Sequence, residues 1–246
     1  VHWHGFAKVL LMSARTQSTA KAAAAPAHLA LLKTLLFAAC LLPLAHLVWG
    51  ALYDELGANP IEFVTRALGD WTLNFLLITL AVSPLRRLTG WHWLIRLRRM
   101  LGLYVFFYAV LHLTTYLWLD QFFDWQEIAK DIVKRPFITI GMSAFVLLLP
   151  LAATSTNAMI RRLGGRRWQQ LHRSIYVIAI FGVVHYWWLV KRDTTQPLIY
   201  ALILAVLLGI RAWWREQERR RQLADGAGFG SRMFKPRGKV IPINPR

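Results

Sequence analysis

Three histidines lie in segments that are otherwise apolar enough for a lipid bilayer. His112 occurs in LHLTTY (111–116), and His172 and His185 occur in RRWQQLHRSIYVIAIFGVVHYWW (166–188). An ionisable side chain inside a membrane is energetically costly, so it is a candidate for function. An imidazole there can ligate a metal, relay protons or form a hydrogen bond between helices. Their positions along the helices help to choose among these roles.

His112 and His185 are expected at a similar depth in the membrane. His112 lies about eleven residues into its apolar segment and His185 about fourteen residues after Leu171. At a rise of 1.5 Å per residue, the two depths agree within about 5 Å. Two imidazoles at one depth on facing helices can hold a haem iron from both sides. The alternative is hydrogen bonding between helices, but the matched pair and the third histidine favour ligation.

His172 raises a geometric difficulty. It lies about 20 Å from His185 along a helix, a distance that suits two stacked haems but not one shared zinc site. Thirteen residues of ideal helix, however, leave the two side chains about 140° apart. Either the segment is irregular, or the two histidines serve different neighbours. Arg98 and Arg99 lie at the level of His172. An arginine near the membrane surface snorkels to the interface or pairs with a phosphate or a haem propionate, and direct iron ligation is the lesser alternative.

The composition predicts an all-α integral membrane protein. Of the 246 residues, 56% are hydrophobic and only 17% are charged. In soluble domains, about a quarter of the residues are charged. The apolar residues form blocks close to the length needed to cross a bilayer. We expect a bundle of six transmembrane helices, whose predicted ranges are Leu29–Leu52, Trp71–Leu85, Leu101–Leu119, Phe137–Ala153, Leu171–Val190 and Pro197–Trp214.

The distribution of charge predicts the orientation. Arginine and lysine gather before the first span, in the second and fourth connections and after the last span, whereas acidic residues gather in the first and third connections. The positive-inside rule therefore places both termini in the cytoplasm, in agreement with an even number of spans. The formal net charge of +18 does not indicate nucleic-acid binding, because it is spread over short connections and a tail. The single cysteine, Cys40, excludes an intrachain disulfide.

Three segments are expected along the chain. Residues 1–28 form a cytoplasmic lead-in, in which 1–11 resemble translated upstream sequence before a start at Met12. Residues 29–215 form the six-helix membrane domain, and 216–246 form a basic, disordered tail. The sequence shows no convincing internal repeat and no glycine-rich phosphate loop. If the protein moves electrons, we therefore expect them to come from another molecule.

Several longer motifs resemble a known family. These motifs are IRLRRMLGLY (95–104), LHLTTY (111–116), TSTNAM (154–159), RRWQQLHRSIY (166–176), VHYWW (184–188) and QPLIYA (196–201). They are similar to those of the MsrQ (YedZ) family, the haem-bearing membrane subunits of bacterial MsrPQ protein-methionine-sulfoxide reductase systems. That family belongs with the ferric-reductase-like transmembrane proteins. The likeness runs from Leu29 to Arg215.

The resemblance implies that His112, His172 and His185 are haem-associated histidines. In the wider superfamily, two histidines on each of two helices hold two b-type haems. This chain departs from that pattern, because Arg98 or Arg99 stands where the fourth histidine would be. The resemblance therefore implies one or two b-type haems, and FMN as a further cofactor for which the sequence assigns no residue.

The resemblance also implies electron transfer outward across the bacterial inner membrane. Electrons would come from the quinone pool or a cytoplasmic flavin reductase and pass to MsrP, a periplasmic molybdopterin enzyme. MsrP reduces methionine sulfoxide in oxidised proteins, so the sulfoxide-reducing site is expected on that partner. We expect it to dock on the acidic outer loops Tyr53–Asp70 and Asp120–Pro136.

Two other functions fit the same histidines. A transporter or proton pathway would use them as a relay, although few acids lie inside the spans and no pair of broken helices marks a binding site. A structural anchor for a partner enzyme would make substitution of the histidines silent.

Overall fold

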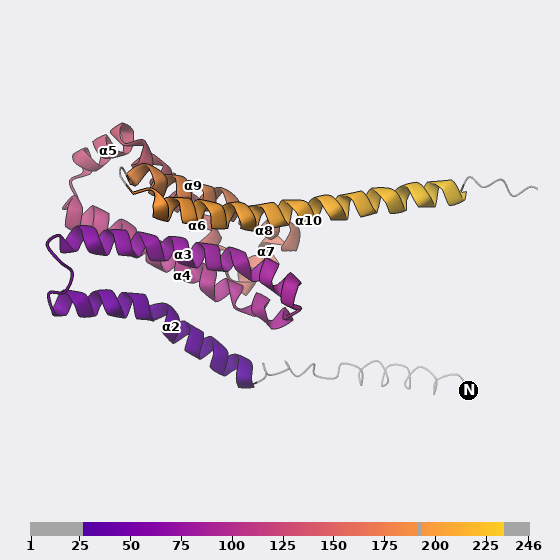
Figure 1. The fold of residues 1–246 in the computed structure, drawn as a ribbon, viewed down its shortest axis with the longest axis horizontal. Helices are drawn as coiled ribbons and strands as arrows, with labels where there is room; N and C mark the ends of the chain where they lie inside the picture. The colour runs from indigo at the N-terminus through magenta and orange to yellow at the C-terminus, as the bar shows by residue number, and fades with distance from the viewer. Residues whose placement is uncertain (1–26, 191–192, 234–246) are drawn as a thin grey trace, which may run out of the picture. The chain divides into compact units, whose positions relative to one another are not determined.

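The computed structural model describes residues 27–190 and 193–233, and these residues form helices joined by short turns (Figure 1). The chain divides into two compact units, 1–49 and 50–246, which are described separately. The expected lead-in before residue 27, including Met12, lies outside the described residues.

Helix α2 (Ala27–Leu52) accounts for nearly all of what is described in the first unit. It includes the predicted first span, and Leu29–Leu52 is long and apolar enough to cross a membrane. Pro43 lies inside the helix, which is visibly bent in Figure 1. A proline in a helix removes one backbone hydrogen bond and commonly causes such a bend.

The second unit begins its bundle with α3 (Pro60–Thr89), twice the length of the predicted span Trp71–Leu85. The side chain of Asn59 accepts a hydrogen bond from the Glu62 N–H, and Pro60 occupies the first helical turn. Gly90, at φ 74°, ends the helix in the left-handed conformation that glycine adopts readily. The prediction was too short because it followed apolar residues only, whereas α3 begins with a polar turn.

Helix α4 (Arg98–Thr114) packs along α3 and continues into η2 (Thr115–Asp120), a π-helical segment. The short η1 (His92–Arg96) precedes α4. Aromatic side chains join the two long helices: the Phe75 ring lies 5.8 Å from that of Tyr104 and 5.1 Å from that of Tyr108. Because Tyr108 is completely buried, this contact forms the centre of the α3–α4 pair.

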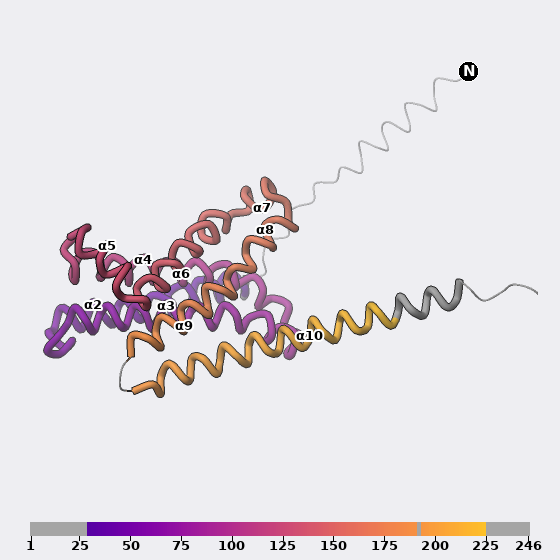
Figure 2. The backbone as a smooth tube through the Cα atoms, turned by 90° about the horizontal axis from the view of Figure 1, so that it is seen from above, coloured from indigo at the N-terminus to yellow at the C-terminus, as the bar shows by residue number. Residues whose placement is uncertain are grey.

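A second helix pair consists of α6 (Pro136–Ala153) and α9 (Ile175–Leu189), which lie side by side (Figure 2). Between α4 and α6 runs the amphipathic α5 (Trp125–Lys134), which contacts α6. The short helices α7 (Asn157–Leu163) and α8 (Gly165–His172) connect α6 to α9. Two packed helix pairs, α3–α4 and α6–α9, therefore form the centre of this unit.

The predicted fifth span, Leu171–Val190, is interrupted after its second residue. Ser174 N–H donates to Leu171 O and Tyr176 N–H to Arg173 O, both at 3.1 Å. These bonds to the third preceding residue tighten the chain between α8 and α9. Helix α9 keeps fifteen residues, about 22 Å at 1.5 Å per residue. The sequence left open whether this segment is irregular, and the structure shows that it is.

Five helices of the described residues are long and apolar enough to cross a membrane. Their ranges are Leu29–Leu52, Pro60–Thr89, Arg98–Asp120, Pro136–Ala153 and Thr195–Ala224. They contain five of the six predicted spans, and the sixth corresponds to the shorter α9. The number of crossings therefore depends on the role of α9.

The last helix, α10 (Thr195–Met233), extends well beyond the predicted end at Trp214 and past the other helices of its unit (Figure 2). Residues 216–233 are thus helical where the sequence predicts a disordered tail, whereas 234–246 lie outside the described residues. Glu216 explains part of this extension, because it pairs with Arg219 and Arg220 one helical turn later.

Candidate functional site

The structure brings His112 and His185 together across the two helix pairs. His112 comes from α4 and His185 from α9, and their ring centroids lie 6.2 Å apart with an interplanar angle of 79°. The sequence predicted that these two side chains lie at a similar depth in the membrane, from the number of residues between each histidine and the start of its helix. His172 comes from a different helix and is the last residue of α8.

Both imidazoles of this pair have the same tautomer. His112 Nδ1 lies 2.8 Å from the Thr65 carbonyl oxygen, and His185 Nδ1 lies 2.6 Å from the Phe137 carbonyl oxygen. A carbonyl oxygen only accepts hydrogen bonds, so each Nδ1 must carry the proton. In the neutral ring, the lone pair is then on Nε2. A histidine that ligates a metal usually has this arrangement, with its second nitrogen bonded to a carbonyl or carboxylate.

The separation of the rings fits two ligands on one metal ion. Imidazole nitrogens bound on opposite sides of a metal, at about 2 Å each, hold their ring centroids about 6 Å apart. The observed 6.2 Å agrees with this value. A rotation of one ring about the shared axis leaves the distance unchanged, so an interplanar angle of 79° is compatible with it. Among the described residues, no group of three or more His, Cys, Asp or Glu side chains forms a metal site.

A cavity of about 620 Å³ surrounds the pair, within the usual range for small-molecule and cofactor sites, about 300–1,000 Å³. The buried residues of its lining are apolar and include Leu73, Leu76, Val105, Leu148 and Ile178. The polar side chains among its lining residues include Glu62, Arg66, Asp70, Asp120 and Arg135. This cavity has the size and the mixed polarity that suit haem, a flat apolar ring with two carboxylates on one edge.

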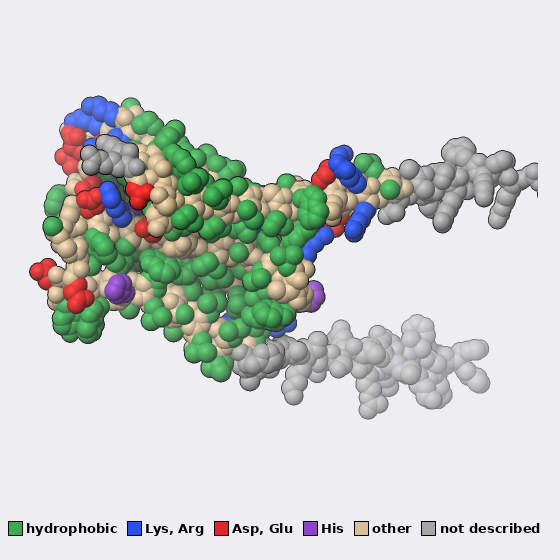
Figure 3. Space-filling view, viewed as in Figure 1, with side chains coloured by type: hydrophobic (Ala, Val, Ile, Leu, Met, Phe, Trp, Pro, Cys, Tyr) green, Lys and Arg blue, Asp and Glu red, His purple; other side chains and the backbone are tan. Residues whose placement is uncertain are grey.

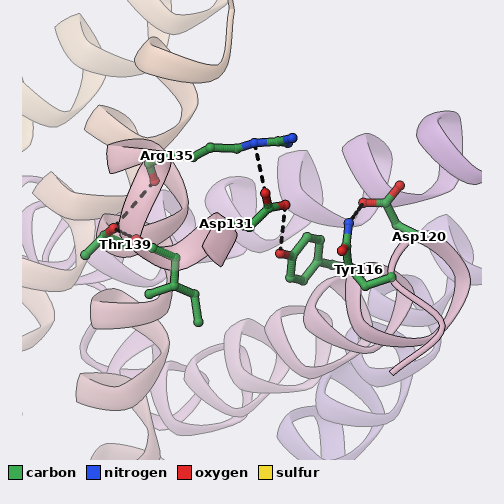
Figure 4. A network of polar contacts seen from close by, with 7 residues as sticks. Tyr116, Asp120, Asp131, Arg135 and Thr139 are labelled. Carbon is green, nitrogen blue, oxygen red and sulfur yellow. Dashed lines mark hydrogen bonds and ion pairs between the residues drawn. The ribbon is translucent and has the colours of Figure 1, made fainter. Parts of the chain in front are cut away.

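A polar network lies beside the cavity (Figure 4). Asp131, on α5, accepts a hydrogen bond from the Tyr116 hydroxyl at 3.4 Å and forms an ion pair with Arg135 Nε at 3.1 Å. Tyr116 and Arg135 line the cavity, while Asp131 itself is buried. The network therefore ties the amphipathic helix α5 to the site that holds the histidine pair.

His172 has different surroundings. Its Nε2 lies 3.0 Å from the Thr154 hydroxyl, and its ring stacks on Trp168 at 4.0 Å between centroids. Thr154 also bonds the Pro150 carbonyl at 2.6 Å. If the hydroxyl donates there, it accepts from His172, whose Nε2 then carries a proton. In this arrangement His172 forms a hydrogen bond between helices, which was the alternative to ligation.

The two predicted arginines also lie apart from the histidine pair. Arg98 Nη1 approaches the Ser83 hydroxyl at 3.5 Å, and Arg98 interacts electrostatically with His172. Arg99 Nη1 donates to Asn157 Oδ1 at 2.8 Å. Neither lines the cavity around His112 and His185. Their role as propionate partners stays a prediction, and it concerns the region of His172.

Sequence reasoning missed four residues of the site. Thr65 and Phe137 contribute main-chain carbonyls, so their side chains give no signal. Gly69 and Gly141 each lie against one imidazole. A glycine inside an apolar helix was the only signal that could have identified them.

Comparisons with known proteins agree with this geometry. Residues 67–183 match the family described as "Ferric reductase like transmembrane component", a range that contains His112 and His172 and ends two residues before His185. A relative from Herminiimonas arsenicoxydans is 62% identical over 79% of this chain and 90% of its own length. It is named "Protein-methionine-sulfoxide reductase heme-binding subunit MsrQ". The chain belongs to the MsrQ family.

Two further relatives carry the same name. The MsrQ of Azospira oryzae is 62% identical over 79% of this chain and 82% of its own length. The MsrQ of Ralstonia nicotianae is 60% identical over 71% of this chain and 81% of its own length. Together with the long apolar helices, membership of this family identifies the chain as a multi-pass membrane protein.

Proposed function

We propose that the protein is a haem-bearing electron-transfer subunit of the bacterial inner membrane. The observation that carries this proposal is the His112–His185 pair, with both Nδ1 atoms bonded to carbonyls and the ring centroids 6.2 Å apart. The names of the MsrQ relatives support haem as the bound group. A b-type haem at this site supplies a centre that takes up and releases one electron at a time.

The residues around the pair have defined tasks in this proposal. His112 and His185 offer their Nε2 lone pairs, and the carbonyls of Thr65 and Phe137 fix the tautomer and orientation of the rings. The buried apolar side chains of the cavity lining would surround the bound group and lower the local dielectric constant. His172, Arg98 and Arg99 are the candidates for a second haem near the other end of the bundle, and FMN remains a further candidate cofactor.

The topology in this proposal has six crossings and two cytoplasmic termini. Helix α9 is the sixth crossing: it is shorter than the others, but α8 and the turn at Ser174 can complete the path. Figure 3 shows acidic side chains gathered at the end of the second unit where α3 begins. Arg86 and Arg87 lie in the last turn of α3, and α7 and α8, which follow α6, carry Arg161, Arg162, Arg166 and Arg167. The positive-inside rule therefore makes the acidic end, where α3 begins, periplasmic.

In this orientation, the protein passes electrons outward from the quinone pool or a cytoplasmic flavin reductase to MsrP, a periplasmic molybdopterin enzyme. The acidic end supports docking of a partner with a basic surface. The double variant Asp54→Lys, Glu55→Lys should slow electron delivery to purified MsrP, while the control Glu218→Lys, on α10, should not. Equal rates in the two variants would contradict docking at the acidic end.

The main test uses proteoliposomes with a membrane-impermeant reductant sealed inside and ferricyanide, which does not cross the bilayer, outside. The haem-loaded protein should reduce ferricyanide, whereas His185→Ala and protein-free vesicles should reduce it only at the background rate. The alternative function, a transporter or proton pathway, predicts that haem-free protein still moves protons. Absence of haem from the purified wild type, produced with sufficient haem, would overturn the proposal.

A further inference from the structure

We propose that Gly69 and Gly141 are positioning residues for the two imidazoles. Each glycine opens the surface of one helix so that a histidine from the neighbouring helix can bond a main-chain carbonyl. The same arrangement occurs twice, once in α3–α4 and once in α6–α9. The inference rests on the proposed function only for the identity of the group held between the rings.

The two arrangements share one register. His112 bonds the carbonyl of Thr65, and Gly69 follows four residues later on α3. His185 bonds the carbonyl of Phe137, and Gly141 follows four residues later on α6. The histidines and their carbonyl partners are separated by 47 and 48 residues. The structure therefore contains an internal repeat that the sequence does not reveal.

Helix geometry explains why glycine is needed at this offset. In an α-helix, the carbonyl of residue i accepts the N–H of residue i+4 and keeps a second lone pair. The side chain of residue i+4 points back toward the N-terminus and covers the turn that contains this carbonyl. Glycine at i+4 has no side chain, so the second lone pair stays accessible to an imidazole.

The distances agree with this explanation. A Cβ atom at Gly69 would lie 3.1 Å from Cε1 and 3.3 Å from Nδ1 of His112. At Gly141 it would lie 2.8 Å from Nδ1 and 2.9 Å from Cε1 of His185. In both cases, the three nearest atoms all belong to the imidazole. Glycines that let helices pack closely would face the backbone of another helix instead.

The hydrogen bond has an electronic consequence. Donation from Nδ1–H to a carbonyl increases the basicity of Nε2, which makes the imidazole a stronger ligand. A stronger donor stabilises the oxidised metal more than the reduced metal. Loss of either bond should therefore raise the reduction potential of the bound haem and let the ring rotate.

The experiment compares Gly69→Ala and Gly141→Ala with two matched controls in purified, haem-loaded protein. The controls are Gly102→Ala, whose Cβ would be 3.9 Å from the nearest side-chain atom, and Gly209→Ala, whose Cβ would meet nothing within 4 Å. The readouts are haem per chain, reduction potential and the electron paramagnetic resonance spectrum of the oxidised form. The last reports the orientation of the two ligand planes.

We expect both site variants to shift the oxidised–reduced equilibrium toward the reduced form by up to about tenfold, about 59 mV for one electron. Gly141→Ala should have the larger effect because its contact is shorter. Both should change the resonance spectrum, and the controls should match the wild type. Site variants indistinguishable from the controls would overturn this inference while leaving the proposed function intact.

A second measurement applies if the alanine variants do not fold. Nitrogen-15 labelled histidine in the haem-free wild type reports the tautomer by nuclear magnetic resonance. The inference requires His112 and His185 to carry the proton on Nδ1 before haem binds. Protonation on Nε2 in either residue would overturn it. Absence of haem from the wild type would instead count against the proposed function.

Discussion

The two regions that contain the candidate histidines are built differently. At the His112–His185 site, two rings from different helix pairs face one cavity, and main-chain carbonyls hold their Nδ1 atoms. At the His172 site, a single ring stacks on Trp168, and its Nε2 bonds the hydroxyl of Thr154. The first site leaves the metal-binding nitrogen available, and the second occupies it.

The difference shows how the role of a histidine in a membrane can be judged. The hydrogen-bond partner of one ring nitrogen decides whether the other nitrogen is available to a metal. Three histidines look alike in sequence, because each lies in or beside an apolar helix. A main-chain carbonyl forces the proton onto the nitrogen that it contacts, whereas a hydroxyl can donate or accept. The carbonyl contacts therefore leave the Nε2 lone pairs of His112 and His185 available to a metal, while His172 would need to leave Thr154 before binding a metal through Nε2.

The largest expected effect is loss of haem from the first site. His112→Ala and His185→Ala should each lower the haem bound at this site at least tenfold, because either change would remove one of its two proposed ligands. His172→Ala should retain that haem. Pyridine haemochrome absorption, normalised to protein, measures these amounts. Equal losses in all three variants would remove the distinction between the two regions.

Asp131→Asn should have the next largest effect. It weakens the links from α5 to Tyr116 and Arg135 beside the cavity. Because the Asp131 side chain is only 13% exposed while Arg135 is 55% exposed, we expect a loss of about 1–2 kcal/mol in the free energy of unfolding. Thermal unfolding in detergent tests this against Asp120→Asn, whose side chain is exposed. Equal stability of the two variants would show that the network contributes little.

Thr154→Val should have a smaller effect, confined to the second region. It removes the hydroxyl that contacts His172 Nε2 and costs about 1 kcal/mol of stability. The reduction potential of the haem at the His112–His185 site should stay unchanged. Ser143→Ala, which removes an exposed intrahelical hydroxyl bond on α6, is the matched control. A changed potential in Thr154→Val alone would show that the regions are coupled.

Asn157→Ala should have the smallest effect. It releases Arg99 from an exposed hydrogen bond, and surface changes of this kind usually alter stability by less than about 0.5 kcal/mol. Haem per chain should equal that of the wild type. A clear decrease in haem per chain would indicate that the Arg99–Asn157 contact belongs to a second haem site. The regions around His172 and around the His112–His185 pair would then both bind haem.

Much of the first site was predictable, because it depends on helix rise. Counting residues from the ends of two apolar segments was sufficient to place His112 and His185 at one depth. The break before α9 was not predictable, since Arg173 and Ser174 are not strong helix breakers. It nevertheless resolves the 140° problem by placing His172 and His185 on separate helices.

The carbonyl contacts and the repeat were beyond sequence reasoning. TRALG (65–69) and FITIG (137–141) share only their final glycine. The repeat becomes visible only when each segment is paired with a histidine nearly fifty residues later. Main-chain groups carry the interaction, so the side chains at Thr65 and Phe137 are free to differ.

The central claim is that two neutral imidazoles hold one haem iron. Near-infrared magnetic circular dichroism of the oxidised wild type tests this claim most directly, because its charge-transfer band depends on the identity of both axial ligands. The account predicts a low-spin spectrum of bis-imidazole type that is preserved in His172→Ala. A high-spin spectrum, or one with water or another side chain opposite a single imidazole, would contradict it.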